Sequence, residues 1–246
     1  MAVYVIADLH LSTNAKTDKS MEVFGARWQG YTEKLKRAWC SLVAEGDTVI
    51  VPGDISWALT LPEAHSDLAF LNALPGKKIL MKGNHDFWWT SISKMEKYCS
   101  ENGFDTLSFL HHSATVVERF IVCGTRGWFY EEGTDKTTPG EAARLTARES
   151  LRLRISLDAA RTLAAAHPTL ETVAFFHFPP VWGGVEGRSF TEQLREAGIR
   201  RCYFGHIHGA YAAPHVTELD GIRYYLAAAD YLSFTPLHIP PCENGK

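Results

Sequence analysis

Five short segments of the chain combine carboxylate, amide and imidazole side chains at spacings that could bind metal ions. In order, they are Asp8-Leu9-His10, Gly53-Asp54, Gly83-Asn84-His85-Asp86, the single His177, and Gly205-His206-Ile207-His208. Oxygen and imidazole ligands suit hard or borderline divalent cations. The segments are far apart in the chain, so they can act together only if the fold brings them to one place. A two-metal hydrolase requires such an arrangement.

Each of these segments follows a short apolar run. The runs cover residues 3–7, 48–51, 78–81, 172–176 and 201–204. Short apolar runs bounded by glycine or proline, with helical stretches between them, indicate buried strands of a mostly parallel sheet. Ligands of open α/β sheets bind just outside the carboxyl ends of the strands. We therefore expect all five segments to meet at one edge of the sheet structure.

The intervening stretches predict helices and loops that would carry these strands. Helical spacing of apolar residues predicts helices over residues 32–44, 62–74, 87–98, 141–166 and 189–197. Two further strands are expected over 116–124 and 221–229, and loops over 11–30 and 126–140. Asp86 would suit the N-cap of the third helix. Because no repeat or linker divides the chain, we expect a single domain over residues 1–246.

Composition limits the classes of partner. The chain has 246 residues, is 46% hydrophobic and carries a formal net charge of −3, so it has no broad basic surface for nucleic acid. Five cysteines, an odd number without a Cys-x-x-Cys pair, predict mostly buried, reduced thiols. The N-terminus leads directly into a strand, and no apolar run approaches membrane-spanning length. We expect a cytoplasmic protein without a membrane partner or an obligate protein partner.

The order of the five segments resembles the calcineurin-like metallophosphoesterase superfamily, from Asp8 to His208. The wider surroundings resemble a bacterial branch of phosphohydrolases without an assigned substrate. They are Met21-Glu22-Val23-Phe24-Gly25, Gly53-Asp54-Ile55-Ser56-Trp57, Asp86-Phe87-Trp88-Trp89 and Gly124-Thr125-Arg126-Gly127-Trp128. The resemblance implies an α/β sandwich of two mixed β-sheets flanked by helices, with a dimetal site at the C-terminal ends of the strands.

The resemblance also implies a role for each candidate residue. Asp54 would bridge two metal ions, and hydroxide between these ions would attack a phosphate ester. The first ion would be bound by Asp8, His10 and His208, and the second by Asn84, His177 and His206. Such ligands admit manganese, iron, zinc, cobalt or nickel, and we favour manganese. His85 would contact the substrate phosphate and protonate the leaving oxygen, and Asp86 could orient it.

Departures from better-known branches narrow the expected substrate. After Gly53-Asp54 the chain lacks the arginine with which phosphoprotein phosphatases grip phosphate, and Trp57 cannot replace the tyrosine ligand of purple acid phosphatases. The Asn-His-Asp version of the third segment favours a phosphodiester or a small organic phosphate. Two alternatives remain, a non-catalytic scaffold such as the related retromer subunit, and a DNA nuclease. The complete ligand set and the net acidity count against them.

Aromatic residues and arginines near the motifs have two interpretations each. Trp57, Trp88, Trp89, Trp128, Tyr130 and Trp182 could contact a flat substrate group or pack the loops. Packing is favoured for the pair at 88 and 89, and substrate contact for Trp128 and Trp182. Arg126 could clamp a phosphate or form a structural ion pair. Three arginines at 144, 148 and 152 form a stripe typical of a solvated helix face, partly offset by glutamates at 141 and 149.

Overall fold

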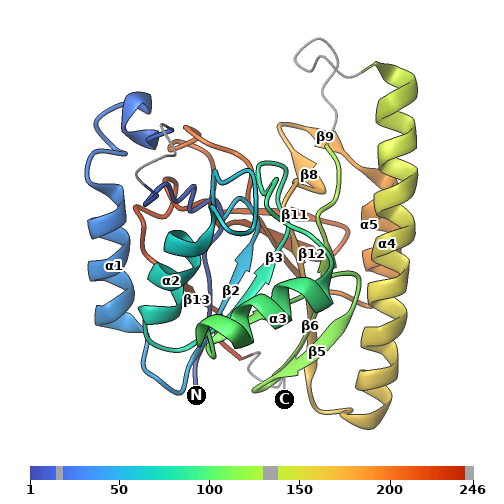
Figure 1. Ribbon diagram of the computed structural model, residues 1–246. Coiled ribbons are helices and arrows are strands. Elements are labelled where there is room, and N and C mark those ends of the chain that lie inside the picture. Colours follow the sequence, from blue (N-terminus) through green and yellow to red (C-terminus); the bar gives the residue numbers. More distant parts are fainter. Residues whose placement is uncertain (15–18, 130–137, 242–246) are drawn as a thin grey trace.

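The computed structural model describes residues 1–14, 19–129 and 138–241. Two mixed β-sheets pack against each other, with helices α1, α2 and α3 on the outer face of the first and α4 and α5 on that of the second (Figure 1). This architecture confirms the expected α/β sandwich.

The first sheet has the strand order β13-β1-β2-β3-β4. Strands β1 (Val3–Val5), β2 (Thr48–Pro52), β3 (Lys77–Met81) and β4 (Leu107–Phe109) are parallel, and β13 (Leu237–His238) runs antiparallel to β1. The connections contain α1 (Tyr31–Leu42), α2 (His65–Ala73) and α3 (Ile92–Asn102), with a short 3-10 helix, η1 (Met21–Phe24), before α1. Parallel strands require such crossovers, which place their carboxyl ends at one rim.

The second sheet has the order β11-β12-β10-β7-β6-β5. Strands β6 (Phe120–Thr125), β7 (Glu171–Phe176), β10 (Arg201–Phe204) and β12 (Ile222–Leu226) are parallel, whereas the edge strands β5 (Ala114–Val117) and β11 (Val216–Leu219) are antiparallel to their neighbours. Helices α4 (Pro139–Ala166) and α5 (Arg188–Glu196) cover this sheet, and a hairpin of β8 (Val181–Trp182) and β9 (Val185–Glu186) precedes α5.

Three apolar clusters hold these layers together. One joins the first sheet to α1, α2 and α3, and a second joins the other sheet to α4 and α5. The third lies between the sheets, where Val5 and Ile50 of the first share a cluster with Val122, Phe175 and Tyr203 of the second. Strands buried on both faces explain why the sequence shows continuous apolar runs there.

Several expected element boundaries were wrong. The third helix begins at Ile92 and not at residue 87, so its N-cap is Ser91 and Asp86 does not cap it. Residues expected as one strand over 116–124 form a hairpin of β5 and β6 that turns at Glu118, where φ is 52°. The sequence also predicts an irregular tail over residues 236–246, but Leu237 and His238 form β13, which pairs with β1.

The described residues also bear on the expectations for the cysteines and for membrane-spanning segments. Cysteines 99, 123 and 202 are buried free thiols, whereas Cys40 is an exposed one. Within this part of the chain, no helix combines the length and the apolarity that crossing a bilayer requires.

Candidate metal centre

All seven candidate ligands lie just after the C-terminal ends of strands, at the rim where the two sheets meet. The first sheet supplies Asp8 and His10 after β1, Asp54 after β2 and Asn84 after β3. The second supplies His177 after β7, and His206 and His208 after β10. Carboxylate and imidazole atoms of Asp8, His10 and His208 lie within 4.8 Å of one another, as do those of Asp8, Asp54 and His177. We call Asp8, His10 and His208 the first group, and Asn84, His177 and His206 the second group.

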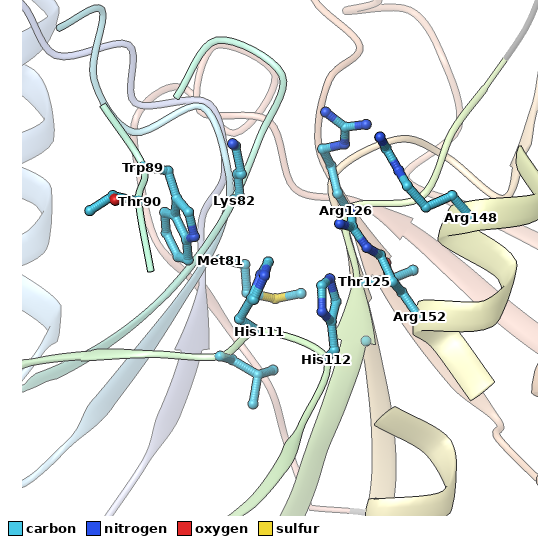
Figure 2. Close-up of a pocket in the computed structure, with 12 residues that line it drawn as sticks. Met81, Lys82, Trp89, Thr90, His111, His112, Thr125, Arg126, Arg148 and Arg152 are labelled. Carbon is cyan, nitrogen blue, oxygen red and sulfur yellow. The ribbon is translucent and has the colours of Figure 1, made fainter. Parts of the chain in front are cut away.

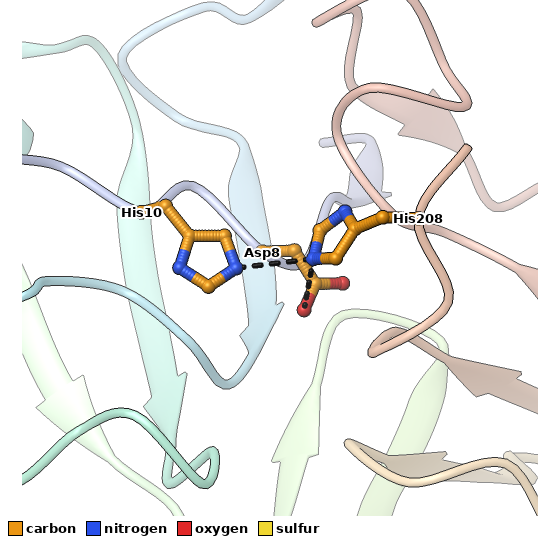
Figure 3. A group of neighbouring side chains, drawn as sticks. All are labelled: Asp8, His10 and His208. Atoms are coloured by element: carbon orange, nitrogen blue, oxygen red, sulfur yellow. Dashed lines mark hydrogen bonds and ion pairs between the residues drawn. The ribbon is translucent and has the colours of Figure 1, made fainter. Parts of the chain in front are cut away.

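The first group pairs two imidazoles above a buried carboxylate. Nε2 of His10 lies 3.1 Å from Nε2 of His208, and the rings point toward each other beside Asp8 (Figure 3). Oδ1 of Asp8 lies 3.9 Å from Nε2 of His208 and is buried without a hydrogen-bond partner among the described residues. Oδ2 of Asp8 accepts a hydrogen bond from the backbone N–H of His206 at 2.8 Å. An orphaned carboxylate oxygen facing imidazole nitrogens fits a cation.

Asp54 lies between the two groups. Its Oδ2 is 3.6 Å from Nε2 of His10 and 3.5 Å from Nε2 of His177. Its Oδ1 accepts a hydrogen bond from the backbone N–H of His85 at 2.8 Å. One oxygen is therefore held by the protein, and the other faces nitrogen ligands on both sides, which is the position of a bridging carboxylate.

The second group contains Asn84, His177 and His206. Nδ1 of His177 lies 3.2 Å from the carbonyl oxygen of Pro52, so this nitrogen carries the proton and donates. Nε2 of His177 then presents a lone pair to Oδ1 of Asn84 at 2.6 Å, and Nδ1 of His206 lies 3.1 Å from the same oxygen. Electron pairs that face each other at this distance repel unless a cation lies between them, so these residues also fit a metal ion.

Burial sets the protonation of the site. It raises the pKa of Asp8 and Asp54 and lowers that of His10 and His177 well below the usual imidazole range. For His208, burial would lower the pKa, but the hydrogen bond to Asp230 and the charge of Asp8 outweigh it and raise the value to about 9. A divalent cation would favour ionised carboxylates and neutral imidazoles together, which are the forms that bind metal.

Asp230 supports the first group and was not identified from the sequence. Its Oδ1 lies 3.0 Å from Nδ1 of His208, and its Oδ2 accepts hydrogen bonds from the backbone of Gly209 at 3.0 Å and from the hydroxyl of Tyr211 at 3.2 Å. A carboxylate on the outer nitrogen fixes the orientation of a ligating imidazole. The sequence does contain a signal for Asp230, because this residue follows an apolar run after β12, a parallel neighbour of β10.

Asp86 holds the loops that carry the bridge. It accepts backbone hydrogen bonds from Asp54 at 2.9 Å, Ile55 at 2.9 Å, Ser56 at 3.2 Å and Gly83 at 2.8 Å. Burial and the charge of Asp54 raise the pKa of Asp86 to about 7, although these hydrogen bonds oppose the rise. The carboxylate thus ties the β2 loop to the β3 loop, and it neither caps a helix nor bonds to His85 among the described contacts.

Four of the ligand residues have left-handed backbone conformations, with φ of 60° at Asp8, 44° at His10, 52° at Asp54 and 71° at His206. Such conformations cost of order 1–3 kcal/mol each outside glycine and are concentrated at functional sites. Gly83 leaves room for the bridging residue, because a Cβ there would overlap the carboxylate of Asp54. The loops are therefore shaped around the ligand atoms.

A cavity of about 350 Å³ opens onto the site. Aromatic and apolar side chains form much of its wall, with Met21 and Phe24 of η1, Trp28, Trp57 and Tyr211 among them. Of these, only Trp57 was considered from the sequence as a possible substrate contact. Its ring stacks on His10 with centroids 4.8 Å apart and lies 4.4 Å from the ring of His85.

The other predicted site residues lie in different places. His85 lines the cavity, with its side chain 37% exposed and Nε2 4.0 Å from Oδ2 of Asp54. Trp128 packs on Phe178, and Trp182 packs edge-on against Phe204, so both contribute to the second apolar cluster and neither lines this cavity. Trp88 and Trp89 are buried in the first cluster, and Tyr130 lies outside the described residues.

The arginines are arranged around a buried glutamate. Arg126, Arg148 and Arg152 all form ion pairs with Glu149, which is fully buried. Arg144 and Arg148 are exposed, as expected of a solvated stripe, whereas Arg152 is half-buried; Glu149 offsets the charge of both Arg148 and Arg152.

The calcineurin-like phosphoesterase family model matches residues 1–210. The Gene 66 protein of Mycobacterium phage L5 is 44% identical over 52 residues, which are 21% of this chain and 25% of that protein, so the chain matches only a quarter of that relative's length. A Thermus thermophilus structure aligns over 96% of this chain and 97% of its own, with 10% identity and a TM-score of 0.56. A protein of unknown function from Aquifex aeolicus aligns over 96% and 95%, with 15% identity and a TM-score of 0.46. The Thermus structure bears on the fold alone. The family match covers most of the chain, which therefore belongs to the calcineurin-like phosphoesterase family.

Proposed function

We propose that the protein is a two-metal phosphohydrolase that cleaves a phosphodiester or a small organic phosphate. The observation that carries this proposal is the position of Oδ2 of Asp54, within 3.6 Å of imidazole nitrogens from both ligand groups. Two divalent ions held on either side of a shared carboxylate supply hydroxide at neutral pH and neutralise the charge of the phosphoryl oxygens.

His85 is our candidate for the proton transfer. It projects into the cavity beside Asp54 and is more exposed than the buried ligands His10 and His177. Burial lowers the pKa of His85, while the charge of Asp54 raises it. Burial outweighs Asp54, so the pKa of His85 lies below its ordinary value. A bound anionic phosphate would raise this pKa, which favours the protonated imidazole that a leaving alkoxide needs.

The cavity wall supports a substrate larger than phosphate itself. The positions after Asp54 hold Ile55, Ser56 and Trp57, so no arginine follows the bridge to grip a terminal phosphate. Apolar and aromatic side chains line much of the cavity instead. We therefore assign phosphate recognition to the metal ions and recognition of the remaining group to this wall.

Metal analysis and a substrate panel test the proposal. Protein reconstituted with manganese should bind about two ions per chain and hydrolyse at least one of a panel of monoesters, diesters and nucleotides. Asp54→Ala should lose both ions and turnover together, whereas the matched surface variant Asp105→Ala should keep them. Absence of metal after reconstitution, or an unchanged metal content in Asp54→Ala, would contradict the two-metal site. A metal-loaded protein without activity on the whole panel would favour a non-catalytic role.

A further inference from the structure

A second cavity, of about 250 Å³, lies at the same rim as the metal centre. It opens between the ends of β3 and β4 in the first sheet and the end of β6 in the second. Strand β3 also leads to the candidate ligand Asn84, and β6 pairs with β7, which leads to His177. The second cavity therefore adjoins the metal centre along the rim, sharing β3 with it in the first sheet and lying one strand away in the second.

Positive charge dominates this cavity. Lys82 faces it from the β3 side, and Arg126, Arg148 and Arg152 face it from the β6 and α4 side (Figure 2). No carboxylate lines it among the described residues. The three guanidinium groups share the buried Glu149 as their counter-charge, at 3.5, 3.3 and 2.7 Å. Three guanidinium groups thus share one carboxylate at this place, and the negative charge that acts on Lys82 is that of Asp86, which does not line the cavity.

One buried donor and one half-buried ammonium group in the cavity have no hydrogen-bond partner among the described residues. Nε of Arg126 is buried and makes no hydrogen bond, and Lys82 makes neither an ion pair nor a hydrogen bond within the described residues. Burying a guanidinium N–H without an acceptor is costly, so Nε of Arg126 indicates an anion that binds there, and the unpaired Lys82 faces the same space. Burial and the neighbouring guanidinium groups of Arg148 and Arg152 also lower the pKa of Arg126, although Glu149 opposes them.

Two imidazoles complete the wall without adding charge. The rings of His111 and His112 lie 3.7 Å apart. Burial and then His111 lower the pKa of His112 to about 4, so it is neutral at pH 7 and can offer one N–H to an oxygen. Planar guanidinium forks, an ammonium and ring N–H groups together suit an anion with several oxygen acceptors, which is a phosphate group.

We propose that this cavity binds a second phosphate group of the substrate while the first lies at the metal centre. This inference rests on the proposed function, because it takes the metal centre as the place of the reacting phosphate. The substrate class is then a compound with two separate phosphate groups, such as a bisphosphate or a nucleotide with an additional phosphate. The apolar cavity on the other side of the metal centre would hold whatever else the molecule carries.

Binding of linked phosphates to the metal-loaded protein tests this inference. Alkanediol bisphosphates of increasing chain length would be titrated calorimetrically against the monophosphates of the same diols. A ligand that reaches both sites gains affinity from its high effective concentration at the second site. We expect one range of lengths to bind at least about tenfold more tightly than the matching monophosphate. The length series removes the need to know the separation of the two sites beforehand.

Matched variants show which residues produce the tighter binding of the bisphosphates. Lys82→Gln should abolish the tighter binding without breaking an ion pair of Glu149, and Arg148→Gln leaves Glu149 paired with Arg126 and Arg152. Arg154→Gln is the control, because Arg154 is an exposed arginine on the same helix that does not line the cavity. Melting temperatures near that of the wild type would show that the variants are folded.

The outcomes separate this inference from the proposed function. Tighter binding of bisphosphates without hydrolysis would leave the cavity assignment standing and remove the proposed activity. Hydrolysis of simple esters with no gain at any length, or a gain that survives Lys82→Gln, would overturn the second phosphate site. Binding of free inorganic phosphate that Lys82→Gln abolishes, with no gain from linkage, would overturn its role in the substrate and leave a free anion as the ligand.

Discussion

At the scale of single residues, Asp230 determines how His208 presents its nitrogen to the first ligand group. Its carboxylate lies 3.0 Å from Nδ1 of His208, which leaves Nε2 directed at His10. Asp230→Ala should weaken metal binding about 10–100-fold, as is typical when the outer partner of a ligating histidine is removed. Asp230→Asn retains an acceptor and should lose less. Chelator competition measures both, and equal affinity in Asp230→Ala and the wild type would exclude this positioning role.

His85 should separate substrates by their leaving groups. His85→Ala removes a proton donor but none of the candidate metal ligands, so metal content and melting temperature should remain near those of the wild type. Turnover of alkyl esters should fall about 10²–10⁴-fold, whereas nitrophenyl esters should lose much less because their leaving oxygen hardly needs a proton. The surface variant His65→Ala serves as control. Wild-type rates on both ester types would disprove the assignment.

The sequence indicated the residues that converge but not the residues that hold them. Asp8, His10, Asp54, Asn84, His177, His206 and His208 follow recognisable strand ends, and strand ends share a rim in a parallel sheet. Asp86 accepts hydrogen bonds from four backbone N–H groups, which belong to two loops that lie side by side only in the folded protein. No local pattern encodes such contacts, which explains why the carboxylate was read as a helix cap.

At the scale of elements, the ligand loops tolerate little added volume. Gly83→Ala would place a methyl group against Asp54 and should lower the free energy of unfolding by roughly 1–3 kcal/mol while weakening metal binding. Gly140, near the start of α4, has no atom within 4 Å of an added Cβ. Gly140→Ala should therefore stabilise the protein slightly, by about 0.4–1 kcal/mol. Denaturant titration measures both, and equal effects would contradict steric crowding at Gly83.

The short helix η1 should act on substrate selection. Phe24 lines the metal-centre cavity yet is 68% exposed, so Phe24→Ser costs little stability. It should raise KM about fivefold to tenfold for a substrate with a large apolar group and spare nitrophenyl phosphate, because only the large group contacts this wall. Leu151→Ser, an exposed leucine on α4, is the control. An equal change on both substrates would exclude η1 from recognition.

Trp128 and Trp182 pack against neighbouring aromatic rings and do not line the metal-centre cavity. Both were favoured as substrate contacts because they occur in glycine-rich loops. Their rings instead pack on Phe178 and Phe204. A loop residue can contact either the core or a ligand, and only the path of the loop decides between them. The sequence was limited in the same way for the α4 arginines. Their spacing places Arg148 and Arg152 on one helix face but does not show that both pair with Glu149.

At the scale of the whole molecule, the candidate metal ions would join the two sheets. The first sheet contributes Asp8, His10, Asp54 and Asn84, and the second contributes the remaining three ligands. Metal at about a hundred times its Kd stabilises a protein by about 2.7 kcal/mol, which corresponds to a Tm shift of roughly 5–10 °C at this size. Chelation should lower the Tm by this amount in the wild type but not in Asp54→Ala. An unchanged wild-type Tm would show that the sheets hold together without the ions.

The wide separation of the ligands along the chain has a consequence for biosynthesis. Asp8 meets the backbone of His206, from which it is separated by 198 positions, and the ribosome makes the first of these residues long before the second. A nascent chain would therefore display an oxygen-rich half-site while the histidines of the second sheet are still unmade. Secure metal capture must wait until β10 has been translated and has joined its sheet, so the selection between competing cellular metals would fall to a nearly finished protein.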